Sequence, residues 1–155
     1  MDFSQLLKFF EELQQELERL TQLQSDKIAA ARAHDLNALN ECMKREQASS
    51  LALRGMEQKR DKLFQALDLS GVPLLEIPGR CPPEQHAAMT AAVEGIKKRS
   101  TLLRSAQEAA RTLLEKDLRS VNQELERRGV FSDLDEHYQT PPGTMPRSMS
   151  TDFRA

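Results

Sequence analysis

The sequence is poor in the residues that build a broad mixed core. Among its 155 residues there is no Trp, one Tyr and two Cys, and aromatic residues make up 5%. Leu, Ala, Glu, Gln, Lys and Arg dominate instead, which is the composition of long helices with narrow apolar faces. The length fits a single domain. The shortage of aromatic residues therefore favours an all-α protein made of long helices.

Motifs for catalysis and cofactor binding are also missing. The chain contains no P-loop and no GxGxxG, HExxH or GxSxG pattern, and His34, His86 and His137 are scattered along it. Cys42 and Cys81 have neither the spacing of a zinc site nor that of a disulfide framework, so we expect two reduced thiols. The sequence predicts no enzyme activity, no catalytic residue, no cofactor and no bound metal.

Charge of one sign and long apolar runs are likewise scarce. The formal net charge is −2, and no segment has the concentrated basic stripe that phosphate binding requires. Residues 1–13 are acidic and amphipathic, and they lack the basic start and apolar run of a signal peptide. No apolar stretch approaches the length of a membrane span. These features predict a cytoplasmic protein that binds no nucleic acid and does not insert stably into a membrane.

Two helices are expected in the first half of the chain. The segment 2–33 has apolar residues at three- and four-residue steps, which form a heptad seam: Phe3, Leu6, Phe10, Leu13, Leu17 and Leu20. The second segment, 36–68, follows Asp35, a good N-cap residue. Because the turn between the two segments is short, we expect them to pack as an antiparallel hairpin.

A third and longer helix is expected over residues 83–128. Two prolines before it and Gly129 after it suit a helix start and a C-cap. Such a helix would be roughly 65–70 Å long, so it must lie along other long helices or bind a partner. The predicted fold is an elongated bundle of three long helices with antiparallel coiled-coil-like packing and a flexible C-terminal tail.

The chain is expected to divide near residue 128. Residues 1–128 would form the helical bundle domain, with a loop at 68–83 whose prolines and glycines exclude a continuous helix. Residues 74–77 of that loop are apolar enough to fold back as a lid over the bundle end. Residues 129–155 would be a short amphipathic segment followed by a flexible tail.

The end of the third helix carries the candidate binding surface. Its apolar residues there recur at helical spacing, and the helix is longer than the two before it, so they would lack a partner within the chain. The alternative is that the third helix folds back and these residues are ordinary core. The predicted partner-binding residues are Leu114, Leu118, Val121, Leu125, Phe131, Leu134 and Tyr138.

One stretch shows a familiar order of features. It reads ARAHDLNALNECMKREQ and then MEQKRDKLFQALDLSG, with a small turn containing Asp, spaced leucines, a lysine-containing stretch and an Arg before a leucine pair. In this order and spacing the chain resembles the FlgN family of flagellar export chaperones. The positions that carry the resemblance are Asp35, Leu36, Leu39, Lys44, Arg60, Leu63, Leu67 and Gly71.

The resemblance implies a non-enzymatic cytoplasmic chaperone. Its partners would be protein cargo, namely the terminal helices of hook-associated flagellar proteins, and components of the type III export gate. A second interpretation is a coiled-coil stalk or adaptor of the export machinery, similar to FliJ, or a generic helical interaction protein. That interpretation favours an uninterrupted antiparallel hairpin, and the 68–83 loop counts against it. The sequence leaves the cargo's identity and the oligomeric state open.

Overall fold

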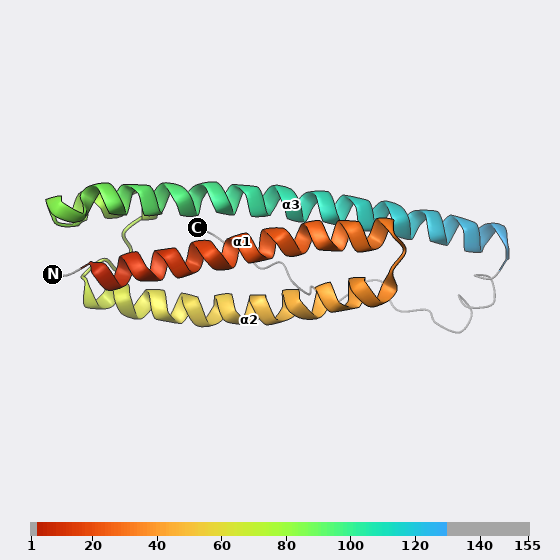
Figure 1. Ribbon diagram of the computed structural model, residues 1–155, viewed down its shortest axis with the longest axis horizontal. Helices are drawn as coiled ribbons and strands as arrows, with labels where there is room; N and C mark the ends of the chain where they lie inside the picture. The colour runs from red at the N-terminus through yellow and green to blue at the C-terminus, as the bar shows by residue number, and fades with distance from the viewer. Residues whose placement is uncertain (1–2, 130–155) are drawn as a thin grey trace. The chain divides into compact units, whose positions relative to one another are not determined.

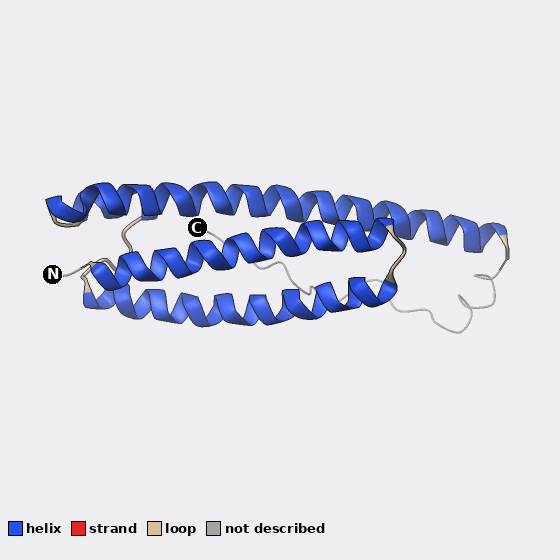
Figure 2. Ribbon diagram, in the orientation of Figure 1, coloured by secondary structure: helices blue, strands red, loops and turns tan. Residues whose placement is uncertain are grey.

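The fold is all-α, as the sequence predicts. The computed structural model describes residues 3–129, in which there are α-helices and 3₁₀ turns but no strand (Figures 1 and 2). The order is α1 (Ser4–Arg32), α2 (Leu36–Ala66), η1 (Leu74–Arg80), η2 (Pro83–Gln85) and α3 (His86–Arg127). The chain divides into two compact units, Met1–Ala110 and Arg111–Ala155. The expected boundary at residue 128 stays a prediction.

The core of the first unit is organised around α1. Five of the six predicted seam residues are buried, and Leu13 is partly buried. Phe9, which the seam does not include, is 1% exposed, and its ring centroid lies 5.9 Å from that of Phe10. Leu23 is buried as well. The buried face of α1 is therefore wider than a two-residue heptad seam, which is what a helix packed on two sides requires.

The predicted antiparallel hairpin of α1 and α2 is present. In the turn, His34 has a φ of 53°, and the Asp35 carboxylate accepts a hydrogen bond from the Ala38 N–H at 3.0 Å, as expected of an N-cap. Two ion pairs then connect the helices at opposite ends. They join Lys27 to Glu46 at 2.8 Å and Lys59 to Glu12 at 2.9 Å.

The segment between α2 and α3 folds onto the core, as predicted for a lid. It contains two 3₁₀ turns: η1 lies where the sequence predicts a loop, and η2 lies where the sequence predicts the start of the long third helix. Ile77 is fully buried and Leu69 is 2% exposed, whereas Leu75 is 65% exposed. The backbone reverses at Asp68 and Gly71, whose φ angles are 57° and 77°. The left-handed conformation at Gly71 is one that glycine adopts without steric cost.

The part of α3 that belongs to the first unit, residues 86–110, runs alongside α1 in the same direction. The Phe3 N–H donates to the side chain of Gln85, just before α3, and Glu18 pairs with Arg99 further along at 2.6 Å. No Cα atom in this part of α3 comes within 8 Å of α1, whereas α2 approaches α1 more closely. Coiled-coil-like packing of all three helices therefore remains a prediction.

Long polar side chains bridge α1 and α3. The Gln14 amide donates to the Ala92 carbonyl at 3.3 Å and accepts from the Arg99 guanidinium at 2.9 Å. A Cβ atom added to Gly95 would collide with the Gln14 side-chain oxygen. The glycine in the middle of α3 thus gives Gln14 the space to cross between the helices.

One buried polar side chain interrupts the apolar layer. Gln24 is 1% exposed, and among the described residues its Nε2 has no hydrogen-bond partner. Ser49 of α2 is also buried. An unpaired buried donor costs roughly 1–3 kcal/mol, so Gln24 is a polar interruption of the apolar face of α1.

The Gln14–Gly95 contact predicts that Gly95→Ala changes the free energy of unfolding differently in the natural chain and in a Gln14→Ala variant. Gly95→Ala alone should leave the free energy of unfolding nearly unchanged. Its gain in helix propensity, about 1 kcal/mol, is offset by loss of the hydrogen bond that the Gln14 oxygen accepts from Arg99, at about 0.5–1.5 kcal/mol. In a Gln14→Ala background the same change should stabilise by about 1 kcal/mol. Urea unfolding of the four proteins measures the coupling. Equal stabilisation in both backgrounds would contradict the bridge.

Candidate binding surface

The C-terminal part of α3 carries an exposed apolar stripe. We define the 114–125 stripe as Leu114, Leu118, Val121 and Leu125, whose four- and three-residue steps place them on one face of the helix. Leu118 is 61% exposed and Val121 is 54% exposed, while Leu114 and Leu125 are partly buried. The other three predicted residues, Phe131, Leu134 and Tyr138, lie outside the described residues.

Burial along α3 changes at the division between the two units. In residues 86–110, one apolar residue in every one or two turns is buried: Met89, Val93, Ile96, Leu103 and Ala110. From residue 111 to residue 127 no residue of α3 is buried. The apolar period nevertheless continues through the 114–125 stripe. The apolar period thus runs along the whole of α3. Its residues are buried only as far as Ala110.

The charged residues beside the 114–125 stripe are held by short-range ion pairs. Arg111 pairs with Glu115 at 3.0 Å, and Glu124 accepts from Arg127 at 2.7 Å and from Arg128 at 3.0 Å. The hydrogen bond from Arg127, with a second from Arg128, lowers the pKa of the Glu124 carboxyl against the opposing effect of desolvation. Glu124 is therefore ionised at neutral pH, and the edges of the stripe are charged.

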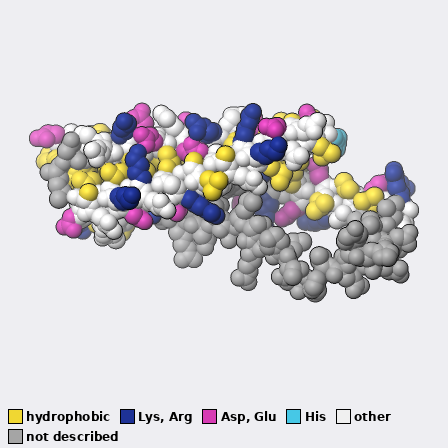
Figure 3. All heavy atoms as spheres, turned by 90° about the horizontal axis from the view of Figure 1, so that it is seen from below, with side chains coloured by type: hydrophobic (Ala, Val, Ile, Leu, Met, Phe, Trp, Pro, Cys, Tyr) yellow, Lys and Arg dark blue, Asp and Glu magenta, His cyan; other side chains and the backbone are white. Residues whose placement is uncertain are grey.

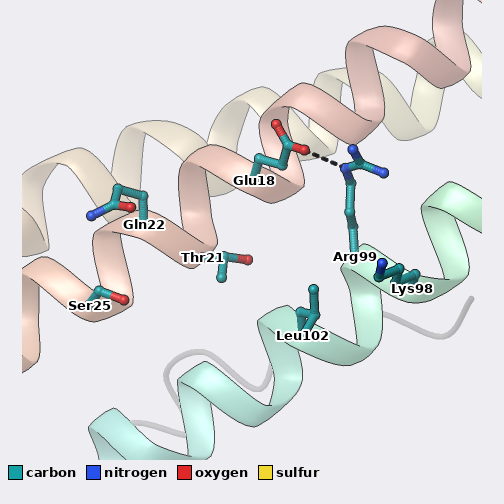
Figure 4. A pocket seen from close by; sticks show the side chains of 7 residues that line it. All are labelled: Glu18, Thr21, Gln22, Ser25, Lys98, Arg99 and Leu102. Carbon is teal, nitrogen blue, oxygen red and sulfur yellow. Dashed lines mark hydrogen bonds and ion pairs between the residues drawn. The ribbon is translucent and has the colours of Figure 1, made fainter.

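A groove in the first unit offers a different kind of surface. It has a volume of about 410 Å³ and lies between α1 and α3 (Figure 4), lined by Glu18, Thr21, Gln22, Ser25, Lys98, Arg99 and Leu102. Arg99 is already paired with Glu18 there, and the Thr21 hydroxyl donates to the Leu17 carbonyl at 2.8 Å. The groove thus brings together neither a nucleophile with a base nor a pair of carboxylates.

The cysteines and described histidines have structural surroundings. The Cys81 thiol and the His86 Nδ1–H both donate to the Pro78 carbonyl, at 3.0 and 2.8 Å, and so tie η1 to the start of α3. Cys42 is buried in α2. Within residues 3–129, no group of three or more His, Cys, Asp or Glu side chains is placed to hold a metal ion.

Sequence reasoning missed the role of several carboxylates of α1. The sequence pattern predicts that Glu11, Glu12, Glu16 and Glu18 form a solvated face opposite the seam, but Glu16 is 6% exposed and pairs with Arg19 at 2.8 Å. Glu12 and Glu18 pair with α2 and α3, and the hydrogen bond from Lys59 lowers the pKa of the Glu12 carboxyl. The sequence does contain cations on the other two helices that could pair with these carboxylates. Assigning the pairs requires knowing how the helices are aligned along one another, which the sequence does not give.

One face of the molecule mixes charged and apolar side chains. The face shown in Figure 3 carries Lys and Arg side chains interspersed with Asp and Glu, and apolar side chains lie between them. None of the helices in the described part of the chain is both long and apolar enough to cross a membrane.

Comparison with protein-family models, with curated proteins and with solved structures finds no match to this chain.

The difference in burial along α3 predicts unequal effects of one substitution at two valines. Val93 is 2% exposed and Val121 is 54% exposed. Val93→Ser should lower the free energy of unfolding by about 2 kcal/mol or more, because it leaves a cavity and buries a hydroxyl. Val121→Ser should change it by less than about 0.5 kcal/mol. Thermal denaturation of both variants measures the difference, and equal losses would show that Val121 is core.

Proposed function

We propose that this chain is a cytoplasmic export chaperone of the FlgN type. In this role it binds the terminal helices of hook-associated flagellar proteins, prevents their premature assembly and delivers them to the type III export apparatus. The resemblance around Asp35–Gly71 suggests this particular system. The role requires no catalysis, cofactor or metal, and the export gate would be a second protein partner.

The observation that carries the proposal is the exposure of Leu118 and Val121 on one helix face. Leaving large apolar side chains in water at helical spacing forgoes burial worth roughly 25 cal/mol per Å². An amphipathic helix from another protein recovers that free energy when its own apolar face packs on the stripe. In the proposed complex, the cargo helix packs its apolar face on the 114–125 stripe and so extends the chain's own bundle of three long helices with coiled-coil-like packing.

The second candidate is a coiled-coil adaptor of the export machinery. The antiparallel hairpin of α1 and α2, closed by the Lys27–Glu46 and Lys59–Glu12 ion pairs, favours it. The segment after α2 weighs against it, because that segment folds onto the hairpin through the buried Leu69 and Ile77 instead of continuing a stalk. The two candidates differ in whether the 114–125 stripe binds exported cargo.

A pull-down with the full chain tests the chaperone proposal. From the cytoplasm of flagellated cells, it should recover a hook-associated protein with an amphipathic terminal helix. The double variant Val121→Ser/Leu125→Ser should stay folded and bind the purified cargo at least about tenfold more weakly, which corresponds to about 1.4 kcal/mol. Recovery of export-machinery components without cargo would favour the adaptor. Normal cargo binding by the double variant would exclude the stripe as the binding surface.

A further inference from the structure

The edges of the 114–125 stripe have charge of one sign. In heptad terms, Leu118 and Leu125 are a positions and Leu114 and Val121 are d positions, so the flanking e and g positions are 115, 117, 122 and 124. These positions hold Glu115, Asp117, Asn122 and Glu124. Three of the four are carboxylates and none is a cation, so any helix lying on the stripe meets an acidic border.

The cations of this segment lie elsewhere on the helix. Helical spacing places Lys116, Arg119 and Arg127 on the face opposite the stripe. Arg111 and Arg128 extend the stripe by one step at each end. Arg111 pairs with Glu115, and Glu124 accepts from both Arg128 and Arg127. The remaining border carboxylate, Asp117, has no ion-pair partner among the residues that the structure describes.

This arrangement disfavours a second copy of the chain as the occupant. An antiparallel pair that matches Leu114 with Leu125 would place Asp117 against Glu124 of the second copy, and symmetry repeats that contact. A parallel pair in register would instead stack Arg111 on Arg111 and Arg128 on Arg128. Each orientation brings like charges together at the edge or the ends of the interface.

We propose that the partner of the 114–125 stripe is an amphipathic helix of another protein with Lys or Arg at the positions beside its apolar residues. This inference rests on the proposed function and specifies the chemistry of the cargo helix. Its cations meet Asp117 and compete with Arg111, Arg127 and Arg128 for Glu115 and Glu124. Its leucine-like residues cover Leu118 and Val121. Opposite charges at e and g positions select the partner and its orientation, while apolar burial supplies most of the affinity.

Two synthetic peptides test the proposal against the full chain. They match residues 111–128 in length and share one leucine stripe at three- and four-residue steps. One has Lys at every position beside the stripe and the other has Glu. Fluorescence anisotropy at about 0.05 M salt should show the Lys peptide binding about tenfold or more tightly, because each exposed ion pair contributes a factor of about two to five. At about 1 M salt the two affinities should converge.

A charge reversal in the chain shows whether the border is responsible. Asp117→Lys should weaken binding of the Lys peptide by about two- to fivefold and strengthen binding of the Glu peptide. Glu57→Lys makes the same change in net charge at an exposed position of α2 and should leave both affinities unchanged. Val121→Ser should weaken both peptides, because it removes apolar area that both use.

Three other results would overturn the proposal, and each points to a different error in it. If both peptides bind equally and Val121→Ser weakens both, the stripe is a docking face but its border does not select charge. If neither peptide binds and sedimentation shows a monomer, the docking face itself is wrong and the proposed function fails with it. If the chain dimerises and Val121→Ser dissociates the dimer, a second copy is the occupant.

Discussion

Burial of the apolar side chains of α1 is the interaction on which the rest of the first unit depends. Leu6, Phe9 and Phe10 are each at most 1% exposed, and burying a large apolar side chain stabilises by roughly 1.5–3 kcal/mol. By contrast, α2 has three buried residues along its length, Cys42, Ser49 and Leu53. Partly buried apolar residues near its C-terminal end, among them Met56, Leu63 and Phe64, pack against the same core, and two ion pairs connect α2 to α1. Leu69 and the lid residue Ile77 are buried in the same core.

The two parts of α3 differ in whether their apolar side chains are buried in that core. Side chains of α3 that reach the core of the first unit are buried as far as Ala110. The apolar period does not stop there, and Leu118 and Val121 remain exposed although helix formation alone would not require apolar residues at those positions. Polar residues of similar helix propensity would form the same helix in water, so the proposed docking face rests on the exposed apolar residues of the stripe.

The sequence predicts the helices well because their signals are local. The Asp35 cap, the glycine after α3 and the apolar period set the helix ends within a few residues of those observed. Contacts between helices were predicted less well, because they depend on register and axial distance. The space that Gly95 leaves for Gln14 and the burial of Glu16 both belong to this class. For the candidate surface, the sequence predicts the stripe, but the exposure of each residue along it depends on which other helices pack there and follows only from the structure.

Hydrogen exchange along α3 tests most directly the claim that the 114–125 stripe is a docking face. In the full chain alone, amides of residues 113–126 should exchange faster than those of residues 89–103, where Met89, Val93 and Leu103 are buried. Adding a saturating Lys-flanked helical peptide should slow exchange in residues 113–126 and leave residues 89–103 nearly unchanged. The account would be contradicted if residues 113–126 were already as well protected as residues 89–103 without any partner.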